Sequence, residues 1–175
     1  MPMRSAVSLN ALQTFVRHDL RLRLRKDLRN LKIVKEADLE CASYYHLRRF
    51  ISSDDRWRIL ARKHAQQTGH FIDLLIFKNA RPRIAIELKW RRKAISRKDL
   101  RSLRASLKKL SVNKAYFVCA IPNESQYKKL RKSVRDKYLL HECVVGLNWT
   151  PTQVQVWEQL RRHFTKEMRS GKAKH

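Results

Sequence analysis

The chain has 175 residues, of which 43% are hydrophobic, so it is long enough and apolar enough to fold as one domain around a core. Its 41 Lys and Arg against 15 Asp and Glu give a formal net charge of +26. This charge favours a polyanionic partner, with nucleic acid expected first and an anionic membrane second. The low content of glycine (3) and proline (4) excludes a collagen-like chain, and no apolar run approaches the roughly 20 residues that span a bilayer.

The N-terminal region and the cysteines bear on the compartment. Arg17 and Asp19 help to interrupt the first apolar stretch, so a secretory signal is not expected. Cys41, Cys119 and Cys143 are far apart and odd in number, which fits reduced, buried thiols better than disulfides or a zinc site. We therefore expect a cytoplasmic or nucleoid-associated protein that uses no membrane and no small-molecule cofactor.

The first third of the chain has helical periodicity. Residues 8–30 predict an amphipathic helix surrounded by Arg and Lys. This helix is either a basic arm on nucleic acid or a helix that docks on the core with one solvated face; binding at a membrane surface is a weaker third interpretation. Residues 35–52 predict a second helix, whereas residues 56–65 fit neither a helix nor a strand clearly.

The pattern then changes to strands. Residues 71–77 are an apolar, β-rich run, and residues 84–90 alternate between apolar and other side chains. Between them, residues 78–83 contain Asn79 and Pro82, which favour a turn. These segments together predict a β-hairpin.

The remaining segments alternate between helix and strand. They predict helices at 96–110 and 124–138, strands at 115–121 and 142–149, and a last helix from Pro151. The order predicts an α/β fold with a mixed sheet. We expect a single domain over residues 1–175, with a basic helical arm at 1–34, a core at 35–149, and a C-terminal helix and tail at 150–175.

Three charged residues stand inside the apolar strands of the hairpin. Asp73 lies in the first strand, and Glu87 and Lys89, two residues apart, share one face of the second. Burying a charge costs on the order of several kcal/mol unless it is paired or bound to a metal. Two carboxylates and an ammonium that meet at one point would offset that cost. Such oxygen ligands suit Mg²⁺ or Mn²⁺, which also take phosphate oxygens and water.

This pattern, Asp73 followed by Glu87-Leu88-Lys89, resembles the PD-(D/E)xK nuclease superfamily, which has the restriction-endonuclease-like fold. The resemblance covers roughly residues 35–121, although Ile72 replaces the proline that precedes the aspartate in the family. It implies an αβββαβ core with a mixed central sheet flanked by helices, plus N- and C-terminal helices.

The resemblance also implies a metal centre that uses Mg²⁺ or Mn²⁺. Asp73 and Glu87 would hold the metal, and the backbone carbonyl of Leu88 is a candidate ligand. A glutamate on the preceding helix would reach the metal directly or through water, with Glu36 the first choice, also as a catalytic residue, and Glu40 the second.

In the reaction that the resemblance implies, Lys89 lies beside the attacking water, lowers its pKa and stabilises charge on the phosphorane. The expected activity is a metal-dependent endonuclease that hydrolyses DNA, with RNA left open, and leaves a 5′-phosphate. A Holliday junction resolvase, a mobile-element endonuclease and a repair nuclease are candidates, and the resemblance implies a homodimer.

Basic residues follow the motif directly, on or beside the helix at 96–110, where they would hold substrate phosphates. They are Arg91, Arg92, Lys93, Arg97, Lys98, Arg101 and Arg104. A solvated helix face is the alternative for about half of them.

Two alternatives to an active nuclease stay open. The hairpin could be a surface hairpin in which Asp73 pairs with Lys89 and Glu87 with Arg91. The chain could also be a DNA- or RNA-binding protein, with or without a nuclease-like fold, that does not cleave, since the charge alone supports binding equally well.

Overall fold

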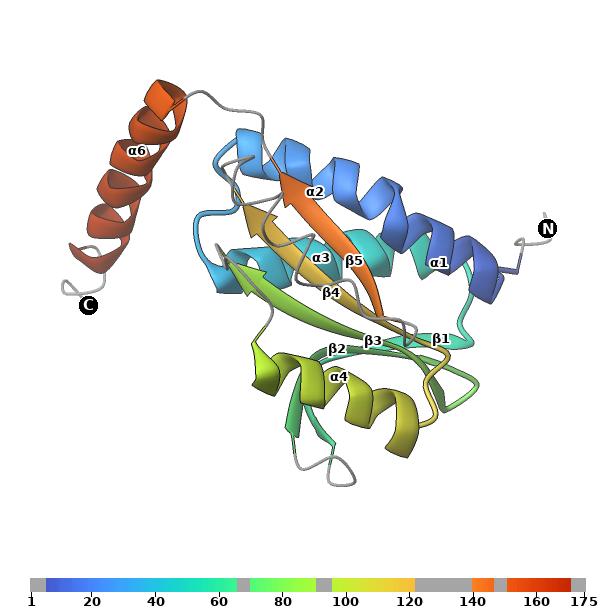
Figure 1. Ribbon diagram of the computed structural model, residues 1–175. Helices are drawn as coiled ribbons and strands as arrows, with labels where there is room; N and C mark the ends of the chain where they lie inside the picture. Colours follow the sequence, from blue (N-terminus) through green and yellow to red (C-terminus); the bar gives the residue numbers. More distant parts are fainter. Residues whose placement is uncertain (1–5, 66–69, 91–95, 122–139, 147–150, 171–175) are drawn as a thin grey trace.

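The computed structural model describes residues 6–65, 70–90, 96–121, 140–146 and 151–170 (Figure 1). It has five described helices: α1 (Leu9–Arg17), α2 (Asp19–Arg29), α3 (Glu36–Ile51), α4 (Arg97–Lys109) and α6 (Pro151–Ser170). Its five described strands are β1 (Trp57–Ala65), β2 (His70–Lys78), β3 (Arg81–Trp90), β4 (Lys114–Ile121) and β5 (Leu140–Gly146). The helix predicted at 124–138 lies outside the described residues.

One mixed sheet forms the centre of the fold, with strand order β1-β2-β3-β4-β5. β1, β2 and β3 pair antiparallel in sequence, whereas β3, β4 and β5 run parallel. The α/β class with a mixed sheet is therefore confirmed, as is the hairpin of β2 and β3. The ambiguous segment at 56–65 is the edge strand β1, which makes the hairpin a three-stranded meander.

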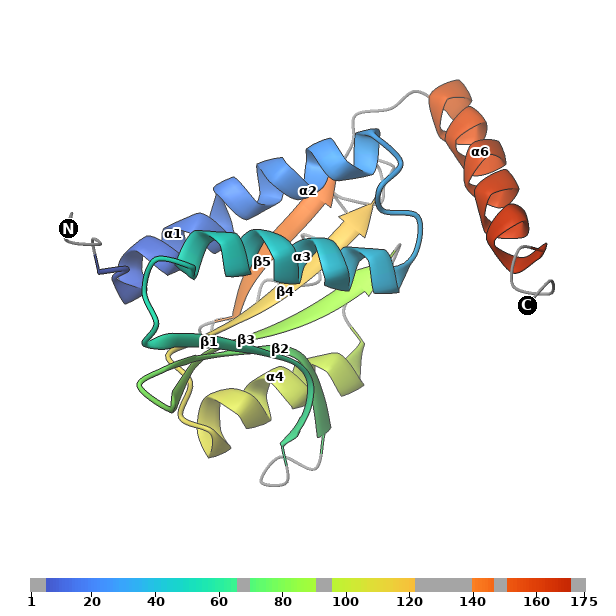
Figure 2. The same ribbon diagram turned by 180° about the vertical axis from the view of Figure 1, so that it is seen from behind.

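The sheet separates two layers of helices. α1, α2 and α3 cover one face, and α4 covers the other (Figures 1 and 2). Alternate residues of β3 and β4 supply the two cores because successive strand side chains point to opposite faces. On β4, Tyr116 and Val118 join the core under α1–α3, and Phe117 and Cys119 join the one under α4.

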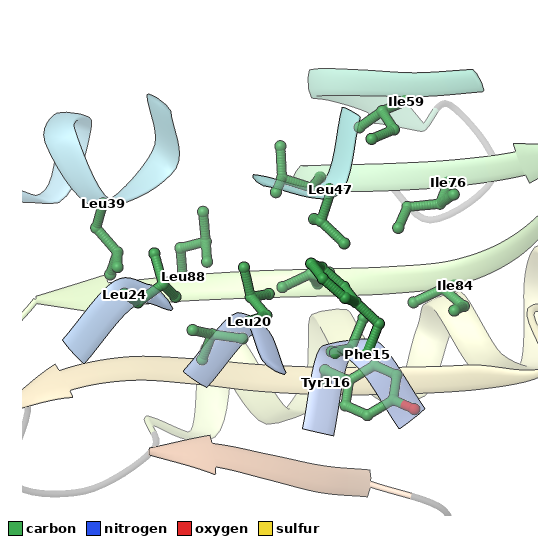
Figure 3. Close-up of a cluster of buried hydrophobic side chains, with 14 of the residues drawn as sticks. Phe15, Leu20, Leu24, Leu39, Leu47, Ile59, Ile76, Ile84, Leu88 and Tyr116 are labelled. Atoms are coloured by element: carbon green, nitrogen blue, oxygen red, sulfur yellow. The ribbon is translucent and has the colours of Figure 1, made fainter. Parts of the chain in front are cut away.

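The larger core lies under α1, α2 and α3 (Figure 3). Ile84, Ile86 and Leu88 of β3 all point into it, with Trp90 packed against its edge. The alternation predicted for residues 84–90 is therefore confirmed, and Glu87 and Lys89 point to the face that α4 covers. Trp157 of α6 also reaches this core and lies 5.7 Å, between ring centroids, from Trp90.

The N-terminal segment is part of this core. The predicted helix at 8–30 is interrupted at His18, yet buried apolar side chains continue at helical spacing on both sides of it. The segment before α1 is also anchored, because Val7 N–H donates to Asp54 (3.0 Å) and Trp57 Nε1–H donates to the Val7 carbonyl (3.1 Å). In the described residues this segment matches the docking interpretation, with its basic side chains on the solvated face.

Two further findings concern the cysteines and the expectation that no segment spans a membrane. Cys119 is buried as expected, but Cys41 is exposed on α3, so the prediction of a buried thiol is wrong there. No helix within the described ranges has both the length and the apolar character needed to cross a membrane.

Candidate active site

The site forms where β2 and β3 separate. The paired register of these strands runs from Lys78 and Arg81 to Leu74 and Ile86. Past that point, the Leu88 N–H donates to the Asp73 carboxylate (2.7 Å). A side chain therefore accepts a strand's backbone hydrogen bond, which fixes one oxygen of Asp73 against β3.

The Lys89 ammonium lies at the centre of the site. Its Nζ donates to Glu87 Oε1 (2.6 Å) and to the Leu88 carbonyl (2.9 Å). Three further carboxylate oxygens surround it, from Asp73 at 3.6 Å, Glu36 at 3.8 Å and Asp99 at 3.9 Å. The structure thus brings together the predicted residues Asp73, Glu87, Leu88, Lys89 and Glu36.

Burial distinguishes this cluster from a surface hairpin. Glu87 is 7% exposed and Lys89 is 9% exposed. Lys89 does approach Asp73, but its closest partner is Glu87. The surface-hairpin alternative is therefore wrong in placing these side chains in solvent, and its other partner, Arg91, lies outside the described residues.

Burial of the site changes the pKa of its charged groups. Burial raises the pKa of Glu87 to about 7, with a further increase from the charge of Asp73, against the opposing effect of Lys89. Burial also raises the pKa of Asp73, opposed by the Leu88 N–H and Lys89. For Lys89, burial lowers the pKa, but the hydrogen bond and charge of Glu87 together with Asp73 and Glu36 raise it above its usual value. Lys89 therefore stays protonated at neutral pH.

The two glutamates of α3 have different partners. Glu36 Oε2 accepts a hydrogen bond from the Trp90 N–H (3.2 Å), which draws its other oxygen toward Lys89. Glu40 is instead paired with Arg62 of β1 (2.9 Å). The geometry places Glu36 closer to the cluster than Glu40, which is held at the rim by its arginine.

An open pocket of about 380 Å³ gives access to the cluster. It is lined by Glu36, Glu40, Arg62, Phe71, Asp73 and Leu88. The pocket has space for several water molecules or for one phosphate group of a larger substrate. The carboxylates of α3 and β2 thus open to solvent on one side, while Glu87 and Lys89 lie behind them.

The donor set suits a hard divalent cation. Mg²⁺ is typically held by one or two carboxylates and takes its other ligands from water and substrate phosphate oxygens. Asp73 and Glu87 supply two such carboxylates, and a cation between them would offset the cost of their burial. Among the described residues, no group of three or more His, Cys, Asp or Glu side chains is arranged to hold a metal ion. Substrate and water oxygens would therefore complete the coordination.

The structure describes only some of the basic residues that are predicted to hold substrate phosphates. Arg97, Lys98, Arg101 and Arg104 are exposed on α4, whose first turn adjoins the cluster through Asp99. Arg91, Arg92 and Lys93 lie outside the described residues.

Sequence reasoning missed two contributors. Asp99 stands at a position where a helix cap already explains an aspartate, and Arg62 lies in the segment that matched no period. The available signal for Asp99 was its place in the first turn of the helix that follows the motif.

In comparisons with known proteins, no family model, no curated protein and no solved structure matched the chain significantly.

Proposed function

We propose that this protein is a metal-dependent endonuclease of the PD-(D/E)xK type, with a restriction-endonuclease-like core. The chain order α3-β1-β2-β3-α4-β4 corresponds to the αβββαβ pattern of that fold, and the motif residues stand on the second and third strands. Mg²⁺ or Mn²⁺ is the proposed cofactor, and DNA is the proposed substrate ahead of RNA.

One observation carries the proposal. The carboxylates of Glu87, which is buried, and Asp73, which is partly buried, converge with the buried Lys89 where two strands separate, beside an open pocket. A purely structural ion pair would need one carboxylate, whereas Lys89 has four within 4 Å. A concentration of carboxylates in a chain of charge +26 suits a divalent cation, which would in turn bind a phosphate.

The residues have distinct roles in the proposed hydrolysis. A bound metal supplies a water of lowered pKa and neutralises phosphate charge. Asp73 and Glu87 orient the ligand oxygens, and Glu36 holds water at the mouth of the pocket. The water loses a proton to solvent as its oxygen forms a bond to phosphorus, the bond from phosphorus to the 3′ oxygen breaks, and that oxygen takes a proton from solvent. One product therefore ends in a 3′ hydroxyl and the other begins with a 5′ phosphate. Because Lys89 stays charged, it stabilises the developing negative charge and does not act as the base.

Other expectations belong to the same proposal. A compact, basic chain in which the described residues form one layered fold suits a structure-selective enzyme acting on branched DNA, and a homodimer would bring two such sites to two strands. A cytoplasmic or nucleoid-associated location follows from such a substrate.

The test is a cleavage assay on supercoiled, linear and branched DNA with Mg²⁺ or Mn²⁺. We expect wild type to cut at least one form and to stop when the metal is chelated. Asp73→Asn should lose at least about 100-fold in rate because it removes the ligand fixed against β3. Asp55→Asn, an exposed acid in the turn before β1, is the matched control and should cut at the wild-type rate. A wild type that cuts no DNA or RNA would refute the proposal.

A binding protein that does not cleave is the second candidate. It is favoured by the position of Lys89, whose ammonium already occupies Glu87 Oε1 and the Leu88 carbonyl without a metal. It predicts tight, salt-sensitive DNA binding that requires no divalent cation, and no cleavage when Mg²⁺ or Mn²⁺ is added.

A further inference from the structure

The Lys89 ammonium uses atoms that a bound metal would need. Its two hydrogen bonds go to Glu87 Oε1 and the Leu88 carbonyl. Both groups are proposed ligands, and a divalent cation repels an ammonium at contact distance. If the proposed metal binds, Lys89 has to move away from Glu87 and find another acceptor in a buried place, because an unpaired buried charge is costly.

Asp73 is also close (3.6 Å) but is itself a proposed ligand, which leaves two carboxylates that could receive the ammonium. Glu36 Oε1 is 3.8 Å away, but half of its side chain is exposed (50%), and it faces the pocket where the metal and substrate would lie. Asp99 Oδ1 is 3.9 Å away, is only 10% exposed, and belongs to α4, and Asp99 does not line the pocket. A shift of about 1 Å would bring Lys89 to hydrogen-bond distance from Asp99.

The helix cap fixes the orientation of Asp99. Its Oδ2 accepts hydrogen bonds from the Ser96 hydroxyl (2.7 Å) and the Ser96 N–H (3.3 Å), while the Ser96 hydroxyl accepts from the Asp99 N–H (3.1 Å). This capping box leaves Oδ1 as the oxygen turned toward Lys89. A cap alone does not require the aspartate to be buried beside a lysine, since such caps form on exposed helices as well.

We propose that Asp99 is a positioning residue of the site, which receives the Lys89 ammonium when a divalent cation binds Asp73 and Glu87. The inference rests on the proposed function. Asp99 would then hold the lysine close to the metal-bound water and the substrate phosphate without being a metal ligand itself. The start of α4 would thereby determine the position of the Lys89 ammonium.

The test separates the charge of Asp99 from its capping role. Asp99→Asn keeps an oxygen that can accept from Ser96 but loses the negative charge. Ser96→Ala removes the hydroxyl of the cap and keeps the charge beside Lys89. Asp99→Glu retains both, because Glu is the usual residue at this position of a capping box. Metal affinity is measured by titration calorimetry with Mn²⁺ on the DNA-free protein, and cleavage gives KM and kcat separately.

We expect Asp99→Asn to weaken Mn²⁺ binding at least roughly tenfold, because one charge at this distance shifts an ionisation by one unit or more. It should lower kcat more than it changes KM. Ser96→Ala should lower Tm but leave Mn²⁺ affinity within about twofold, and Asp99→Glu should recover most of the affinity.

Several results would overturn the inference. If Ser96→Ala and Asp99→Asn weaken Mn²⁺ binding equally, Asp99 acts only through the cap. If wild type cleaves DNA, and Asp99→Asn binds Mn²⁺ and cleaves DNA as wild type does, the inference fails and the proposed function stands. If wild type neither binds Mn²⁺ nor cleaves, both fail together.

Discussion

Lys89 and Glu87 show how charged residues are accommodated inside this sheet. Their side chains lie 2.6 Å apart and are both buried, yet Glu87 keeps a pKa of about 7 because burial outweighs the attraction of the lysine. A carboxyl whose ionised form is unfavourable in the folded chain lowers stability when it ionises. Such a cost at a site open to solvent is typical of functional rather than structural positions.

This cost predicts a pH dependence of stability without divalent cations. The pKa of Glu87 rises on folding from 4.5 to about 7, so between these values the folded state binds a proton that the unfolded state has released. The free energy of unfolding therefore falls as pH rises through this window, with a contribution from Glu87 of up to about 3 kcal/mol. Urea unfolding of wild type and Glu87→Gln from pH 4 to 8 measures it. Glu87→Gln should gain stability relative to wild type as pH rises, and parallel curves would contradict the pKa assignment.

At the scale of residues, a site residue could be predicted from the sequence only where it departed from the pattern around it. Asp73, Glu87 and Lys89 could be predicted because charges inside apolar strands are anomalous. Asp99 could not, because its place in a Ser96-x-x-Asp99 pattern is already explained by local capping. Its contact with Lys89 depends on how α4 returns across the sheet, which no local pattern encodes.

At the scale of elements, α3 and α4 were predicted to within one residue at each end, whereas β1 and the division between α1 and α2 were not predicted. The apolar stripe of residues 8–30 continues through His18, so its period does not reveal the interruption between α1 and α2. β1 could not be assigned because exposed Leu60 and Arg62 disturb its alternation, and Arg62 takes a positive φ of 46°. That arginine then pairs with Glu40 at the pocket.

α4 provides a prediction on nucleic-acid binding. Its exposed arginines begin next to the cluster, whereas α2 lies on the opposite face of the sheet (Figures 1 and 2). Arg97→Ala with Arg101→Ala should weaken binding to all DNA sequences. If both residues contact phosphates, the salt dependence of log K should become shallower by about 2. Arg21→Ala with Lys26→Ala on α2 is the charge-matched control. Fluorescence anisotropy from 50 to 300 mM salt measures both, and equal slopes would contradict a footprint on α4.

The whole molecule combines a large positive charge with a small buried negative cluster. The hairpin and the mixed sheet could be predicted from the periodicity and order of the elements, because β3 and β4 carry apolar side chains at their buried positions. The assignment of the helices to the two faces of the sheet could not be predicted from periodicity. Which face α1 and α2 would cover depended on packing against β3 and β4, and a basic arm had the same sequence pattern as a docking helix.

The central claim is that Asp73 and Glu87 serve one reaction, which the cleavage rates of a double-mutant cycle test most directly. Residues that act as a unit lose activity in a strongly non-additive way. With Mg²⁺ and equal DNA binding, we predict that Asp73→Asn and Glu87→Gln each lower the single-turnover rate at least about 100-fold, and that the double variant is slower than either by only a few fold. Single variants that cut like wild type, or losses that multiply in the double variant, would contradict the account.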